Sequence, residues 1–256
     1  MTCALFAQAV LALGTLVDPV PVDLGGFRAG DGVDVKHDAG RERLTLSWPM
    51  TPDGSEFGRL VVDLRAGQPL IESMGLAATA GGESTPILTA VDPVVFVTVG
   101  SRENPPGRPP GMSVFNVFFD SPAKRPHQTF KATLVPKAVK VDGTADRASV
   151  LIDGLTAGPF SGGLRITVYA GARLVHVEAL VSTDEANRAI TYDAGLVSDA
   201  PSWTGVGWVD VEGALRRENV SADRAFKVKY RTIFAAAKGG TVASFPPPHS
   251  SSTRAT

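Results

Sequence analysis

The chain has 256 residues, which is enough for one large domain or two small ones. Hydrophobic residues make up 43% and charged residues 20%, a balance that supports a packed core and excludes disorder over the whole chain. With 25 Lys and Arg against 26 Asp and Glu, the chain lacks the basic excess of nucleic-acid-binding proteins, so we expect no nucleic-acid partner. Cys3 is the single cysteine, which excludes an internal disulfide and a cysteine-based zinc site.

An apolar run, Ala4–Val17 (ALFAQAVLALGTLV), lies near the N-terminus. It is too short for a transmembrane helix, which takes about 20 residues, so we expect no membrane span. Its length suits the apolar centre of a secretory signal, which predicts that residues 1–17 are signal-like and that the protein is periplasmic or secreted. No positive residue precedes the run, which leaves an upstream start, a weak signal or a buried helix as alternatives.

Short runs rich in β-forming residues recur from Val33 onward, with turn residues between them. Apolar and polar residues alternate in many runs, for example from Leu44 to Trp48, which is the pattern of a half-buried strand. The expected strands are Val33–His37, Arg43–Trp48, Arg59–Arg65, Val94–Gly100, Ser113–Asp120, Thr129–Val135, Ala138–Asp142, Ala148–Asp153, Gly163–Tyr169, Arg173–Ser182, Ala189–Val197, Gly207–Val211, Phe226–Phe234 and Thr241–Phe245.

Hairpin turns are predicted between several of these strands, at Arg65–Gln68, Val141–Thr144 and Ala170–Ala172. Strong helical periodicity is missing after Val17, although Leu215–Ala225 has room for one or two helical turns. We therefore predict an all-β fold, a large antiparallel β-sandwich with little helix apart from the N-terminal segment. It forms a single domain over residues 18–245, followed by a disordered tail at 246–256.

The strongest candidate for catalysis is the pair His176 and Glu178, which lie two residues apart and therefore on one face of a strand. A carboxylate beside a histidine can fix its tautomer for proton transfer. Arg165 or Thr167 is expected opposite the pair, across the hairpin at Gly171, and we predict that Arg165 binds substrate. The alternative is that these residues form an ordinary polar outer face of the sandwich.

A second group of candidates consists of aromatic and acidic residues for substrate binding. Trp203 and Trp208 flank a glycine-rich segment that we expect to be a turn, and aromatic rings commonly stack on sugars. Asp210 and Glu212 are expected on one strand face, where a carboxylate pair suits glycosidase or lyase chemistry. The alternative is that at least one tryptophan packs in the core.

Tyr192 and Asp193 complete the predicted substrate-binding residues, because a tyrosine with a lowered pKa can take a proton in some polysaccharide lyases. The more ordinary alternative is a strand tyrosine with a satisfied hydroxyl. The four histidines show no metal-ligand spacing, and the chain has no P-loop, no dinucleotide-binding fingerprint and no G-x-S-x-G motif. We therefore expect no metal and no cofactor, and an ordinary α/β-hydrolase is excluded.

Two segments, Gly58–Leu76 and Gly163–Val197, resemble the galactose-mutarotase-like supersandwich. The second segment has the order of a strand, a glycine hairpin, a strand with His-x-Glu, a polar turn, and a strand ending in Tyr-Asp-x-Gly-Leu. The fold occurs in aldose epimerases, polysaccharide lyases and N-terminal domains of glycoside hydrolases. The resemblance implies carbohydrate as the partner, and epimerases of this fold use a His and a Glu.

These observations predict an exported β-sandwich domain that binds or processes glycans, with catalysis left open. The alternative is a non-catalytic structural or protein-interaction domain of the cell envelope. The sequence after Phe245–His249 suggests a truncated reading, with a further domain C-terminal to this chain.

Overall fold

The structure is a computed structural model, and it describes residues 18–30, 32–102, 126–199, 201–219 and 227–246. These residues form sixteen strands and no helix, which confirms the all-β prediction. The expected strand Ser113–Asp120, the N-terminal segment 1–17 and residues 247–256 of the expected tail lie outside the described residues.

The largest sheet has seven strands in the order β12-β6-β5-β4-β3-β2, with β7 paired to β6 beyond the end of β5. Its strands pair in an antiparallel manner throughout. Their bounds are β2 Asp34–Asp38, β3 Arg43–Pro49, β4 Phe57–Asp63, β5 Ile71–Ala77, β6 Ser84–Ser101, β7 His127–Lys131 and β12 Arg188–Val197.

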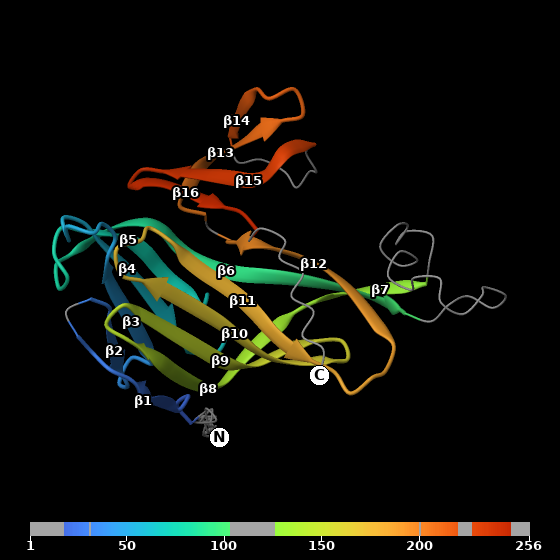
Figure 1. Ribbon diagram of the computed structural model, residues 1–256, viewed down its shortest axis with the longest axis horizontal. Helices are drawn as coiled ribbons and strands as arrows, with labels where there is room; N and C mark the ends of the chain where they lie inside the picture. The colour runs from blue at the N-terminus through green and yellow to red at the C-terminus, as the bar shows by residue number, and fades with distance from the viewer. Residues whose placement is uncertain (1–17, 31, 103–125, 200, 220–226, 247–256) are drawn as a thin grey trace, which may run out of the picture.

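A five-stranded sheet in the order β1-β8-β9-β10-β11 forms the second layer, and it lies in front of β2 to β5 in Figure 1. Its strands are β1 Val22–Phe27, β8 Thr133–Thr144, β9 Arg147–Ala157, β10 Phe160–Tyr169 and β11 Val175–Ser182. The antiparallel pattern has one exception at an edge, where β1 pairs with β8 in parallel. Two strands with more than a hundred residues between them need no hairpin, so either direction is open to them.

The inner faces of these two sheets pack against each other through one large core. On β3 the alternation of the sequence points Leu44, Leu46 and Trp48 inward, and each is at most 1% exposed. Ile152 and Ile166 meet them from the five-stranded sheet and are fully buried in the same cluster. The two layers are therefore a β-sandwich, as the sequence predicts.

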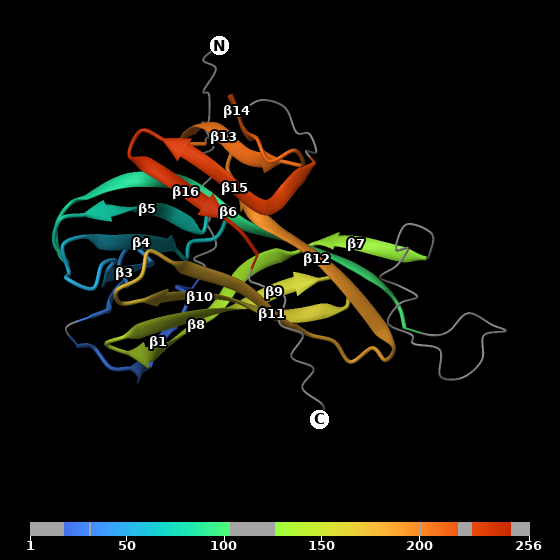
Figure 2. The same ribbon diagram turned by 45° about the horizontal axis from the view of Figure 1, so that its top comes forward.

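A smaller cluster lies at the end of the sandwich where β6, β7 and β12 extend beyond β5 (Figure 2). Val97 and Val99 of β6 pack there with Ala157 and Phe160 of the β9–β10 hairpin. Ile190 of β12 covers this cluster and is half-buried.

A third sheet of four strands has the order β14-β13-β15-β16 and lies above the sandwich in Figure 1. Its strands are β13 Trp203–Asp210, β14 Leu215–Asn219, β15 Val228–Ala237 and β16 Gly240–Ser244. The expected helical turn at Leu215–Ala225 is wrong over Leu215–Asn219, because β14 pairs with β13 along this segment. The expected turn around Gly205 and Gly207 is also wrong, since both glycines lie inside β13 and pair with β14 and β15.

Two of the three predicted turns are found where the sequence places them. Gly67 and Gly171 have φ angles of 74° and 76°, a left-handed conformation that glycine adopts without strain. The third prediction is wrong in position, because Val141–Thr144 belongs to β8 and the chain turns at residues 145–146. Asp142 and Gly143 pair with Ser149 and Ala148, so the strand continues through a sequence typical of a turn.

Candidate functional site

The outer face of the five-stranded sheet brings three of the predicted site residues together. Arg165 of β10 lies directly opposite Glu178 of β11, and an Arg165 Nη1 to Glu178 Oε1 distance of 3.4 Å makes them an ion pair. Thr167 lies opposite His176 in the same register, as expected across the hairpin at Gly171. The inward-pointing neighbour Ile166 is fully buried, Arg165 and Glu178 on the outer face are about one-third exposed, and Thr167 on the same face is only 5% exposed.

Neighbouring hydroxyl groups on this outer face also bond to each other. Thr167 shares a hydrogen bond with Ser149 of β9, with 3.2 Å between the two hydroxyl oxygens. The His176 side chain forms no hydrogen bond to any residue that the structure describes. The arrangement supplies a histidine and a paired carboxylate on one face, both half-buried.

The remaining predicted residues lie on the other two sheets. Tyr192 and Asp193 are exposed on β12, where they pair with Val97 and Phe96 of β6. Trp203, Trp208 and Asp210 belong to β13 of the four-stranded sheet. The predicted site is thus divided among three sheets.

Both tryptophans are at least partly buried. Trp208 is 5% exposed. Trp203 is half-buried and packs against the large core. Burial of their large apolar area accounts for both positions.

Asp210 organises the turn between β13 and β14. Its carboxylate accepts hydrogen bonds from the backbone N–H groups of Glu212 and Ala214 at 3.0 and 2.8 Å, and from Arg216 Nε at 2.6 Å. These hydrogen bonds, that of Ala214 foremost, lower the pKa of Asp210. Glu212 is also held by Arg216, at 3.5 Å.

The expectation that Asp210 and Glu212 share a strand face is therefore wrong, because β13 ends at Asp210 and Glu212 belongs to the turn. The two carboxylates lie near each other around one arginine. Asp210 serves the turn as a hydrogen-bond acceptor, and its lowered pKa keeps it ionised at neutral pH.

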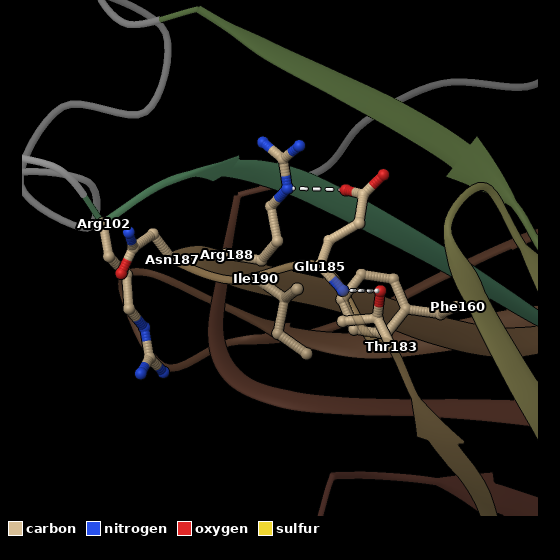
Figure 3. Close-up of a pocket in the computed structure, with 7 residues that line it drawn as sticks. All are labelled: Arg102, Phe160, Thr183, Glu185, Asn187, Arg188 and Ile190. Carbon is tan, nitrogen blue, oxygen red and sulfur yellow. Dashed lines mark hydrogen bonds and ion pairs between the residues drawn. The ribbon is translucent and has the colours of Figure 1, made fainter.

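The described surface has two adjoining depressions at the end of the sandwich that holds the smaller cluster. The first, which we call the Phe160 depression, has a volume of about 310 Å³ (Figure 3). The second, the His127 depression, has a volume of about 630 Å³. Both volumes fall in the range of small-ligand sites. Residues Glu185 and Arg188 line both, joined by an ion pair of 2.7 Å from Arg188 Nε to Glu185 Oε2.

The Phe160 depression combines an apolar floor with a polar rim. Phe160 and Ile190 form the floor, and both belong to the smaller cluster. The rim consists of Arg102, Thr183, Glu185, Asn187 and Arg188. Figure 3 shows the Arg188 and Glu185 side chains turned to each other, with the guanidinium of Arg102 extending to the opposite side.

The local backbone explains how the rim is built. Asn187 has a φ angle of 57°, a left-handed conformation that asparagine tolerates better than most residues. Its carbonyl accepts a hydrogen bond of 2.7 Å from the N–H of Arg102, which ties the β11–β12 turn to the end of β6. Thr183 Oγ1 accepts a hydrogen bond from the N–H of Glu185 at 3.2 Å and fixes the start of the turn.

The rim residues are not among the site residues predicted from the sequence. The one feature of the local sequence that could have pointed to them is the cluster of turn-forming polar residues between Thr183 and Arg188. Arg102 and Phe160 come from distant parts of the chain, and only the fold places them beside this turn.

Among the described residues, no group of three or more His, Cys, Asp or Glu side chains is placed to hold a metal ion. Helices able to cross a membrane are likewise not found in that part of the chain. No protein-family model matches the chain, and no curated protein matches it either.

Proposed function

We propose that the chain is a glycan-binding β-sandwich domain and that the Phe160 depression receives the sugar. The observation that carries the proposal is the combination of an apolar floor, Phe160 and Ile190, with a rim of guanidinium, amide, hydroxyl and carboxylate groups. Binding sites for small polar ligands generally pair apolar contact with a few polar groups that fix the orientation.

The chemistry of the rim suits sugar hydroxyls. A hydroxyl both donates and accepts, so it can bond to the carboxylate of Glu185 and the guanidinium of Arg188 at once. Charged partners make such hydrogen bonds stronger than neutral ones. The C–H face of a pyranose ring would then lie on Ile190, which is half-buried.

The first experiment is a glycan array with the wild-type chain, followed by affinity measurements on two variants. Arg188→Ala removes a rim cation, and Asn187→Gly removes an amide while keeping the left-handed backbone. Because a hydrogen bond to a charged group contributes about 1.5–3 kcal/mol and a neutral one about 0.5–1.5 kcal/mol, we expect Arg188→Ala to bind a glycan about tenfold or more weakly and Asn187→Gly about two- to tenfold more weakly.

The matched control is Arg165→Ala, an arginine of similar exposure outside the depression. Its affinity should equal that of the wild type. A wild type that binds no glycan on the array contradicts the proposal. Equal affinities of all variants place any binding elsewhere on the surface.

Export and turnover are parts of the proposal that rest on the sequence alone. The apolar run at residues 4–17 supports a periplasmic or secreted location, which fractionation of expressing cells would test. Catalysis by His176 and Glu178 is tested by measuring oligosaccharide turnover in His176→Ala and Glu178→Gln. A further domain C-terminal to this chain is tested by sequencing the source DNA past the stop.

A protein-interaction role is the second candidate, and the four-stranded sheet supports it. Leu215 of β14 and both Tyr230 and Ile233 of β15 are each more than half exposed. Large apolar side chains gathered on one sheet commonly mark a contact surface. Ile233→Ser would raise solubility without loss of stability if this surface meets a partner, whereas unchanged solubility and lower stability would indicate an ordinary packing role.

A further inference from the structure

We propose that β11 is the pairing edge for a second copy of this chain, which joins two five-stranded sheets into one continuous sheet. In the described part of the structure β11 pairs only with β10, so its other edge carries unpaired backbone groups. Such an edge is a template for another strand. This proposal does not involve the Phe160 depression.

The sequence of β11 lacks the usual protection of an exposed edge. Natural proteins protect edges with lysine, proline or bulges, and Val175–Ser182 contains neither lysine nor proline. Its pairing with β10 is also free of register shifts along its length. The edge strand β14, by contrast, carries Arg216, Arg217 and Glu218 in five residues.

The alternation of β11 limits how two copies can pair. Val175 and Val177 face the core, whereas His176 and Glu178 face outward. In an antiparallel pair, directly opposite residues point to the same side, so inward residues must meet inward residues. Two identical copies paired in this way are related by a twofold axis. That axis must therefore pass through a residue position of β11 and not between two successive residues.

Among these registers, the one centred on Val177 is self-complementary. It places His176 of each copy opposite Glu178 of the other, and Leu174 opposite Leu180. An axis at His176 would place histidine opposite histidine and Leu174 opposite Glu178. An axis at Glu178 would place the two carboxylates opposite each other. Opposite charges and apolar pairs stabilise a cross-strand contact, and like charges weaken it.

The side chains concerned have bonding capacity left. Glu178 bonds Arg165 through Oε1, and Oε2 forms no hydrogen bond within the described residues. His176 is similarly unpartnered there and always carries at least one N–H donor. Leu174 is 42% exposed, and Leu180 of the second copy would cover it.

The other long edge, β12, does not offer such a register. Arg188 and Asp193 are its only charged residues, and their odd spacing places them on opposite faces of the strand. Self-pairing of β12 cannot bring these two opposite each other. The observations therefore favour β11.

The test is sedimentation of the wild type and two variants. A single strand pair is a small interface, so we expect the wild-type mass to rise from monomer to dimer between about 1 and about 100 µM. His176→Glu places carboxylates opposite each other and should leave a monomer over this range. The exchange variant with His176→Glu and Glu178→His restores opposite partners and should dimerise again.

Thermal unfolding of the variants at low concentration checks that each one folds. Hydrogen exchange at high concentration should show slower exchange of the β11 amides in the wild type, and unchanged exchange in His176→Glu. A wild type that stays monomeric overturns the proposal. So does a His176→Glu variant that still dimerises, and an exchange variant that stays monomeric overturns the register.

Discussion

Trp48 connects the two large sheets at a single point in the core. It is 1% exposed, and its indole N–H donates a hydrogen bond of 2.9 Å to the carbonyl of Ala172. Its ring covers Gly58 of the neighbouring strand, where a Cβ atom would lie 2.4 Å from the indole. Gly58 is thus required by the close approach of a large side chain.

We expect Gly58→Ala to lower the free energy of unfolding by about 1–3 kcal/mol, the usual cost of adding a methyl group to a packed core. Urea denaturation measures the change. Gly81→Ala is the matched control, because no atom lies within 4 Å of a Cβ at that position. Equal stability of the two variants would mean that the Trp48 ring moves aside freely.

Asp63 is a buried acid whose charge is satisfied by one arginine. The side chain is 4% exposed, and it accepts hydrogen bonds from the N–H and the Nε of Arg65 at 3.0 and 2.9 Å. Burial alone would raise the pKa of Asp63, but the hydrogen bonds and the charge of Arg65 outweigh it, so the pKa is lowered. A lowered pKa means that the ionised form stabilises the fold.

The stability from Asp63 should be fully present above the unfolded pKa of about 3.9 and lost as the pH falls below it. We expect Asp63→Asn to cost about 2 kcal/mol at pH 7, with the difference from wild type shrinking at pH 3. Urea denaturation at both values measures it, with the exposed Asp193→Asn as the control. A difference that is the same at both pH values would contradict this role.

At the scale of elements, the β10–β11 hairpin is held against β3 by two hydrogen bonds. The N–H of Gly171 donates to the carbonyl of Pro49 at 2.8 Å, beside the bond from Trp48 to Ala172. Arg173 adds an ion pair with Glu56. These contacts fix the start of the free edge strand.

We expect Trp48→Phe to speed hydrogen exchange of the β10–β11 hairpin, because it removes the bond to Ala172 while keeping an aromatic ring. Exchange followed by mass spectrometry measures this. Trp203→Phe is the control, since Trp203 packs on the same core without bonding to the hairpin. Faster exchange in both variants would assign the effect to lost ring volume.

Strands with regular alternation could be predicted from the sequence, and interrupted strands could not. Arg43–Trp48 and Gly163–Tyr169 were expected nearly as found, as β3 and β10. Of β6, which spans Ser84–Ser101, the sequence predicts only Val94–Gly100. The rest of β6 was not predicted, because it contains Pro86 and Pro93, which are unusual inside a strand. Pro86 lies at a register shift in the pairing with β5, and Pro93 lies in the gap between the residues that pair with β5 and those that pair with β7.

The candidate site was less predictable than the fold, for a physical reason. His176, Glu178 and Arg165 share one hairpin, so local spacing was enough to place them together. The Phe160 depression takes Arg102, Phe160 and Arg188 from three distant strand ends. Local patterns carry no record of such long-range packing.

At the scale of the whole molecule, the two clusters differ in size. Counted over the residues that the structure describes, the large core holds twenty buried residues and the smaller cluster holds four. Regions with few buried apolar contacts open at a lower free energy than the main core. The end of the sandwich with both depressions is therefore the more easily opened part.

A matched pair of substitutions tests this difference. We expect Ile152→Ala, in the large core and 0% exposed, to cost about 2–5 kcal/mol of unfolding free energy. Ile190→Ala, in the half-buried cover of the smaller cluster, should cost less and act mainly on local exchange near β7. A larger cost for Ile190→Ala would show that the smaller cluster supports the whole fold.

The pairing of β6 has a consequence during synthesis of the chain. One edge of β6 meets β5, which the ribosome makes just before it, whereas the other edge waits for β12. About 90 residues separate the nearest partners, so at ordinary translation rates this edge stays open for roughly 5–20 s. During this time, nascent chains on the same messenger RNA can contact each other through the unpaired edge of β6. Slower translation lengthens the time for which that edge is unpaired.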